Sequence, residues 1–116
     1  MKSERMRRVD EAVREVLSEA VTSEIKDPRV GFITVTDVDT SPDLRHARVY
    51  VSVLGDDAGR KRRSMDGLNS AHGYLQRRVA RQLRLKHTPT LEFRYDDSVD
   101  RSLRIAELLD GEAAAE

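Results

Sequence analysis

Apolar residues recur every three or four positions over the first part of the chain. Between Glu4 and Lys26 they are Val9, Ala12, Val13, Val16, Leu17, Ala20, Val21 and Ile25. Because this spacing places them along one side of a helix, it predicts an amphipathic helix with a single apolar face. Pro28 disfavours helical geometry at Asp27, and Gly31 loosens the chain just beyond, so the helix is predicted to stop near these residues.

Two segments with the alternating pattern of strands follow. Residues 30–38 are dense in β-branched side chains and place Ile33 and Val35 on one face, with Phe32, Thr34 and Thr36 on the other. Residues 45–55 alternate more regularly. The inward set is Ala47, Val49, Val51 and Val53, and the outward set is His46, Arg48, Tyr50 and Ser52. The two segments predict an antiparallel hairpin around residues 39–44.

A second helical pattern runs from Arg60 to Leu85. Its apolar stripe consists of Met65, Leu68, Ala71, Leu75, Val79 and Leu83. Gly73 interrupts this stretch, and an interior glycine costs a helix about 0.5–1 kcal/mol relative to alanine. We therefore predict two helices that meet at a kink.

The last part of the chain predicts one more strand and a short helix. Within residues 88–98, Leu91, Phe93 and Tyr95 share one face. A short helix is expected around residues 101–109. We expect one domain over residues 1–110 and a frayed acidic tail over residues 111–116.

The predicted order of elements is helix, strand, strand, helix, kink, helix, strand. This order indicates an α+β domain in which the helices cover one face of a three-stranded sheet. It matches the type II KH topology, in which a GXXG loop joins two helices and clamps single-stranded nucleic acid. The corresponding position here is Ser70-Ala71-His72-Gly73, which keeps only the second glycine. A tighter helix-kink-helix joint is predicted in place of the loop.

Long blocks of the chain resemble the ribosome-binding factor A family. They are RRVDEAVREVLSEAV, KDPRVGFITVTDVDTSPDLRHARVYVSV, SAHGYLQRRVARQLRLKHTPTLEFRYDDS and RIAELL. The Ala-X-Gly kink of that family falls on Ala71-His72-Gly73. The resemblance implies a KH-like fold without enzymatic activity that binds immature small (30S) ribosomal subunits. It further implies contact near the 5′-terminal helix and decoding region of 16S rRNA, help in 5′-end maturation, release by a GTPase partner and a link to growth in the cold.

Charge is distributed unevenly along the chain. Lys and Arg number 21 and Asp and Glu number 21, so the formal net charge is zero. Residues 60–86 nevertheless hold nine cations and one acid, whereas residues 91–116 hold three cations and eight acids. A local basic patch suffices for RNA binding, because cations replace the counterions at phosphates. The predicted RNA-binding residues are Arg60, Lys61, Arg62, Arg63, Arg77, Arg78, Arg81, Arg84 and Lys86.

An arginine run on a helix is more often a solvated face than a binding site. Here the near absence of acids favours binding, because solvated faces usually mix both signs. The first helix does mix them, with six of each over residues 1–26, so RNA contact by Arg5, Arg7 and Arg8 stays open. Gly73 is equally consistent with close packing and with RNA contact. His72, His46 and His87 are read as ordinary residues, and Ser70 is predicted to cap the second helix of the pair.

Composition excludes several other classes of protein. The chain has no cysteine, which rules out disulfides and thiolate zinc sites. It lacks a long uncharged apolar run and a signal-peptide pattern, so a soluble protein in the cytoplasm is expected. A monomer without a cofactor or a small-molecule substrate is also expected. The segment from Asp37 fails as a calcium loop, because Pro42 stands where glycine is needed and Arg48 where glutamate is needed.

Two rival functions remain at this stage. A nuclease could hold Mg²⁺ at Asp96, Asp97 and Asp100, but turn and helix-cap roles suit these aspartates better. A protein-interaction adaptor could present the arginine face to an acidic protein. The few aromatic residues argue against an RNA-stacking platform on the sheet.

Overall fold

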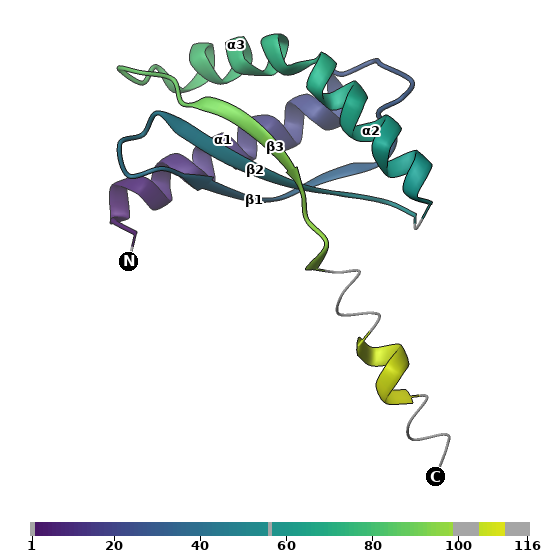
Figure 1. The fold of residues 1–116 in the computed structure, drawn as a ribbon. Helices are drawn as coiled ribbons and strands as arrows, with labels where there is room; N and C mark the ends of the chain where they lie inside the picture. Colours follow the sequence, from purple (N-terminus) through teal and green to yellow (C-terminus); the bar gives the residue numbers. More distant parts are fainter. Residues whose placement is uncertain (1, 56, 99–104, 111–116) are drawn as a thin grey trace.

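The fold is described from a computed structural model of the chain, which describes residues 2–55, 57–98 and 105–110. Figure 1 shows the three-stranded sheet with its long helices packed against one face, whereas the short helical segment at residues 105–110 lies away from the sheet. The elements in order are α1 (Glu4–Ser23), β1 (Ile33–Thr40), β2 (His46–Val53), α2 (Ala58–Ser70), α3 (His72–Leu83) and β3 (Thr90–Tyr95). This is the predicted α+β, type II KH-like order.

The sheet has the strand order β1-β2-β3. β1 and β2 form the predicted antiparallel hairpin, with Val35 opposite Val51. β3 runs parallel to β2, with Phe93 opposite Val49. A parallel neighbour needs a long crossover, and α2 and α3 together supply it.

β1 contains an irregularity that the alternating pattern did not predict. The register shifts between Val35 and Asp37, so that Val38, and not Asp37, joins the buried side. A bulge of this kind adds one residue to a strand and reverses the alternation beyond it. The hydroxyl of Thr36, at the bulge, donates to the carbonyl of Tyr50 at 3.2 Å and to Oδ2 of Asp96 at 2.7 Å.

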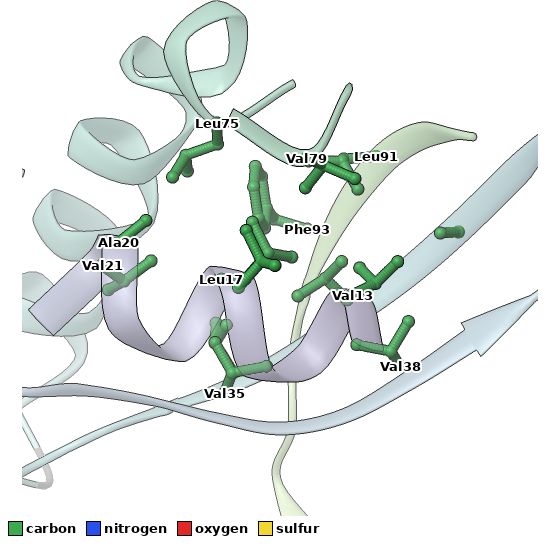
Figure 2. Close-up of a cluster of buried hydrophobic side chains, with 14 of the residues drawn as sticks. Val13, Leu17, Ala20, Val21, Val35, Val38, Leu75, Val79, Leu91 and Phe93 are labelled. Carbon is green, nitrogen blue, oxygen red and sulfur yellow. The ribbon is translucent and has the colours of Figure 1, made fainter. Parts of the chain in front are cut away.

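The core lies between the helices and the covered face of the sheet (Figure 2). All four residues predicted to point inward from β2 are buried, as are Leu91 and Phe93 of β3. The helices contribute side chains with no exposed surface, namely Val13, Leu17, Ala20, Leu68, Leu75 and Val79. Complete burial of such a side chain stabilises the fold by about 1.5–3 kcal/mol. The predicted helix stripes therefore form the core.

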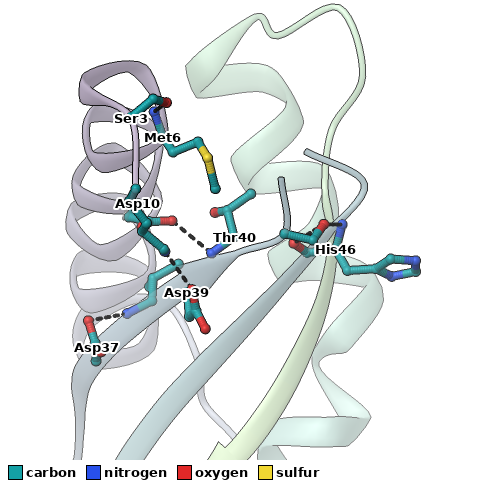
Figure 3. A network of polar contacts seen from close by, with 10 residues as sticks. Ser3, Met6, Asp10, Asp37, Asp39, Thr40 and His46 are labelled. Carbon is teal, nitrogen blue, oxygen red and sulfur yellow. Dashed lines mark hydrogen bonds and ion pairs between the residues drawn. The ribbon is translucent and has the colours of Figure 1, made fainter. Parts of the chain in front are cut away.

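α1 begins at a serine cap and ends earlier than predicted. The Ser3 hydroxyl accepts a hydrogen bond from the Met6 amide at 3.2 Å. The helix stops at Ser23, and the Ile25 amide bonds back to the Ala20 carbonyl at 3.2 Å. Within the first turns of α1, Oδ1 of Asp10 accepts a hydrogen bond from the Thr40 amide at 2.9 Å. This bond fixes α1 to the end of β1 (Figure 3).

The helix pair breaks at Ala71, two residues before the glycine that predicted the kink. Ala71 has φ −89° and ψ 5°, and its amide bonds to the Gly67 and Leu68 carbonyls. The prediction that Ser70 caps α3 is wrong, because α3 begins without a side-chain cap. The Ser70 hydroxyl instead donates to the Asp66 carbonyl one turn back, at 3.0 Å.

The remaining predicted segments are only partly described. α2 begins at Ala58, two residues before the predicted start, and residues 105–110 are helical. The predicted closing helix also includes residues 101–104, which lie outside the described residues, as does the predicted tail over 111–116. Within the described ranges, no helix is long and apolar enough to cross a membrane.

Candidate nucleic-acid interface

The outer face of α3 carries an exposed stripe of arginines. Gly73, Arg77, Ala80 and Arg81 are exposed at three- and four-residue spacing, opposite the buried Leu75 and Val79, and the exposed Arg84 follows at the C-cap with φ 47°. Tyr74, Arg77, Ala80 and Arg81 line a shallow depression on this face. The predicted spacing thus gives a continuous cationic surface along one side of the helix.

Arg77 and Arg81 form no ion pair with any acid in the described part of the chain. Glu24, beyond the end of α1, is taken by two other partners. The Tyr74 hydroxyl donates to Glu24 Oε1, and Arg78 Nε lies 3.2 Å from the same oxygen. These bonds, the Tyr74 bond foremost, lower the pKa of Glu24 and keep it ionised. The exposed guanidiniums therefore remain available to an external anion.

Arg78 is less available than its neighbours. Its side chain keeps only 18% of its exposure, and Nη1 donates to Oε1 of Gln82 at 2.9 Å. The guanidinium therefore joins α3 to the end of α1. Its predicted contact with RNA stays a prediction that would require these bonds to be shared or exchanged.

The first turns of α2 hold the second basic cluster. Arg60, Arg62 and Arg63 are exposed, whereas Lys61 is half-buried with its ammonium 5.0 Å from the ring centre of Tyr95. Asp57 caps the helix by accepting from the Gly59 amide at 2.8 Å. Backbone amides at the helix start lower the pKa of Asp57, so it stays ionised beside the arginines. This carboxylate partly offsets the unfavourable placement of cations at a helix N-terminus.

Arg29 joins the two basic clusters and was missed by the sequence analysis. Its Nη2 donates to the Ser70 hydroxyl at 3.0 Å, directly before the kink. The same guanidinium pairs with Asp27, Nη2 to Oδ2 at 2.6 Å, and holds the pKa of Asp27 to about 2. The loop also lies tightly on α2, since a Cβ on Gly67 would be 2.8 Å from a methyl of Val30. The KDPRVG block signalled a helix end but not this contact over 41 residues.

The kink residues have mainly structural contacts. A ring nitrogen of His72, Nε2, lies 2.8 Å from the Leu91 carbonyl, and the ring packs edge-on against Phe93 at 6.0 Å. His72 therefore fixes α3 to β3, in agreement with its reading as a kink residue. Gly73 is exposed, and a Cβ there would lie 3.3 Å from Nη1 of Arg77.

The other predicted cations lie at the opposite end of the helix layer. α1 runs antiparallel to α3, so Arg5, Arg7 and Arg8 lie toward the end of the molecule that carries Arg84 and Lys86 (Figure 1). All five side chains are exposed. Nε of Arg8 lies 3.8 Å from Glu4, and contact of these residues with RNA stays a prediction.

The open face of the sheet is mixed in charge. Asp39 lies opposite Arg48, which lies opposite Glu92 in β3. In the described ranges, no group of three His, Asp or Glu side chains could hold a metal ion. Asp96 instead accepts from Thr36 and from the Ser98 amide, and Asp100 lies outside the described residues. This arrangement favours the turn role over the nuclease.

Known proteins are similar to this chain in both sequence and fold. Residues 5–109 match the family model of ribosome-binding factor A. Ribosome-binding factor A of Halothermothrix orenii is 48% identical over 94% of this chain and 88% of its own length. That of Anaeromyxobacter sp. is 52% identical, over 88% of this chain and 84% of its own.

Structures of ribosome-binding factor A proteins are also similar to this chain. A putative ribosome binding factor A of Thermotoga maritima is 32% identical with a TM-score of 0.72, covering 84% of this chain and 92% of its own. A Thermus thermophilus ribosome binding factor A, fitted as a homology model into a cryo-electron microscopy map of a 30S complex, is 26% identical with a TM-score of 0.61, covering 84% and 97%. On sequence and fold together, this chain belongs to the ribosome-binding factor A family.

Proposed function

We propose that the protein is a noncatalytic assembly factor that binds the small ribosomal subunit through RNA. The observation that carries the proposal is the exposed arginine stripe of α3, whose Arg77 and Arg81 are unpaired within the described residues. The relative from Thermus thermophilus was fitted into a map of a 30S complex, which supports the same partner here.

The chemistry of the stripe suits a phosphate backbone. An arginine guanidinium is always charged and offers a planar fork of donors that matches two phosphate oxygens. Each phosphate that it neutralises releases condensed counterions, which favours binding at low salt. Arg77 and Arg81 lie one turn apart on the helix, and Arg84 follows just beyond its end. They would therefore contact successive phosphates, while α2 adds Arg60, Arg62 and Arg63.

The finer parts of the function are also proposals. Binding is to immature 30S subunits near the 5′-terminal helix and decoding region of 16S rRNA, where the protein assists 5′-end maturation. A GTPase releases it, and it acts as a cytoplasmic monomer that supports growth in the cold. Family membership supports these assignments. The positioning of RNA needs no catalytic group, and the described His72 is engaged with backbone and core.

Co-sedimentation with separated ribosomal subunits tests this proposal. The purified protein is centrifuged with small or large subunits at low and moderate salt, beside the variant Arg77→Ala, Arg81→Ala. We expect co-migration with the small subunit alone and a loss of about 10-fold or more in affinity for the variant, since a bond to a charged group contributes about 1.5–3 kcal/mol.

A matched control removes the same charge from the other side of the molecule. Arg48→Ala with Arg94→Ala takes two arginines from the open face of the sheet, where both are exposed. This control should retain wild-type association. Binding to neither subunit, or to both equally, would contradict the assigned partner, and equal losses in both double variants would remove the α3 stripe from the site.

A further inference from the structure

A hollow lies beside the start of α2, away from the α3 stripe. It forms where the loop before β1 meets the end of β2 and the first turns of α2. Its lining consists of Pro28, Arg29, Gly31, Phe32, Leu54, Arg60, Arg63 and Ser64. We call this feature the Phe32 hollow.

Phe32 presents an aromatic ring to solvent on a fixed backbone. The ring is 81% exposed, and Leu54 beside it is 68% exposed. The Leu54 amide donates to the Phe32 carbonyl at 3.0 Å, which extends the hairpin ladder by one bond. The other described aromatic side chains are buried or half-buried. An exposed ring on a strand backbone fixed in this way is suited to stacking against a flat ligand.

Cationic groups surround the ring. Arg60 and Arg63, one turn apart on α2, line the hollow and have no ion pair with any acid among the described residues. Arg29 lines it from the opposite side, although its charge is shared with Asp27. Within the described part of the chain, no acidic side chain lines the hollow. The lining therefore favours a ligand that is both planar and anionic.

A buried hydroxyl lies in the wall of the hollow. Ser64 has no exposed surface, and its Oγ has no hydrogen-bond partner. Gly31 adjoins it, since a Cβ built on this glycine would lie 3.9 Å from the Ser64 oxygen. Buried polar atoms are rarely left without partners, and such an atom at a surface hollow indicates a partner that arrives on binding.

We propose that the Phe32 hollow binds one unpaired nucleotide of RNA. Its base stacks on Phe32, its flanking phosphates bind Arg60 and Arg63, and Ser64 supplies a hydrogen bond at the wall. The inference rests on the proposed RNA-binding function and adds a base contact to a surface otherwise suited to phosphates. A protein ligand is less suited, because it would have to bring both an acidic group and an apolar group to so small a site.

Fluorescence of the variant Phe32→Trp tests the stacking directly. The chain has no tryptophan, so the introduced indole is the sole reporter, and it keeps an aromatic ring at the position. The probes are a short, unstructured oligoribonucleotide and an abasic sugar-phosphate oligomer of the same length. We expect the base-bearing probe to quench the fluorescence and the abasic probe to leave it unchanged.

Affinities of further variants complete the test. Phe32→Ala should weaken binding of the base-bearing probe about 10-fold, the typical effect of losing one stacked base, and should hardly change binding of the abasic probe. Leu108→Ala is the control, since it removes a 64% exposed apolar side chain that does not line the hollow, and it should have little effect. Absence of quenching, or equal binding of the base-bearing probe by wild type and Phe32→Ala, would overturn the proposal.

Two outcomes separate this inference from the proposed function. If Phe32→Ala leaves RNA and subunit binding intact while Arg77→Ala, Arg81→Ala abolishes subunit binding, the nucleotide site is wrong and the proposed function stands. If Phe32→Ala weakens subunit association without altering binding of the base-bearing probe, the hollow contacts a ribosomal protein, which also overturns the nucleotide site. Failure of the wild type to bind the small subunit would instead contradict the proposed function.

Discussion

α1 and α3 lie side by side on the same face of the sheet, yet they use their charges differently. Both bury an inner face completely, with Leu17 in α1 and Leu75 in α3. On α1, Lys2 before the helix pairs with Asp10 and Asp39, and Arg14 Nε lies 3.1 Å from Glu11. On α3, Arg77 and Arg81 have no acid partner among the described residues, and on α1 the same holds only for Arg5 and Arg7 in the first turn.

The difference separates charges that serve the fold from charges that are available to a ligand. Both helices show the same amphipathic pattern, so the pattern alone does not distinguish them. The pairing of each arginine does distinguish them. A guanidinium already bonded to a carboxylate must exchange that bond to bind a phosphate. An unpaired guanidinium need only lose water and counterions. Arg78 makes the contrast within a single helix, since it pairs with Glu24 while its neighbours do not.

Truncating one buried leucine in each helix tests whether the inner faces of α1 and α3 are equally well packed. Leu17→Ala and Leu75→Ala each remove a fully buried side chain. We expect each to lower the free energy of unfolding by about 2–5 kcal/mol, the range for such truncations. Urea unfolding followed by circular dichroism measures this. A cost well under 1 kcal/mol for either variant would mean that its helix is not packed as described.

Single substitutions on α3 should sharpen the contrast between paired and unpaired arginines. Arg78→Ala removes a partner of Glu24 and should lower the free energy of unfolding, with a smaller effect than either leucine truncation. Arg81→Ala should leave stability nearly unchanged and should weaken association with the small subunit. Thermal unfolding and co-sedimentation of both variants measure these effects. A loss of stability in Arg81→Ala, together with weaker subunit association only in Arg78→Ala, would contradict the distinction between paired and unpaired arginines.

The smallest expected effect concerns the Asp27–Arg29 pair. Hydrogen bonds from Arg29 hold the pKa of Asp27 to about 2, below the value of about 3.9 for an unfolded chain. A depressed pKa stabilises the folded state above about pH 4, and this contribution disappears as the pH falls through 2. The stability difference between wild type and Asp27→Asn should therefore shrink over that range in urea titrations. A difference independent of pH would show that the pair contributes nothing to folding.

Much of the fold was predictable because its elements have strong local patterns. The regular alternation over 45–55 identified the inward residues of β2, and the three- to four-residue spacing identified the buried faces of α1 and α3. In α2 it identified Leu68 but not the buried Ser64 and Gly67. The bulge before Asp37 was not predictable, because it depends on pairing with Tyr50 in the other strand. Similarly, Gly73 signalled a kink, but the break falls at Ala71, whose backbone departs from helical geometry with ψ 5°.

The candidate site was predictable in composition but not in pairing. The excess of cations over residues 60–86 indicated the basic helix pair, and the spacing of Arg77, Arg81 and Arg84 gave the exposed stripe. Glu24, the acid partner of Arg78, and Ser70, the hydroxyl partner of Arg29, lie 54 and 41 residues away, so no local pattern indicates these two contacts. The alternation did place Phe32 on the face opposite Ile33 and Val35, in agreement with its exposure.

The salt dependence of association with the small subunit tests the central claim most directly. Dissociation constants of wild type, Arg77→Ala with Arg81→Ala, and the control Arg48→Ala with Arg94→Ala are measured over a range of potassium chloride concentrations. Each phosphate contact contributes about 0.7–0.9 to the slope of log affinity against log salt. We expect the α3 double variant to reduce the slope by roughly 1.4–1.8 and the control to leave it unchanged. Identical slopes for all three proteins would contradict the claim that the unpaired arginines of α3 bind RNA phosphates.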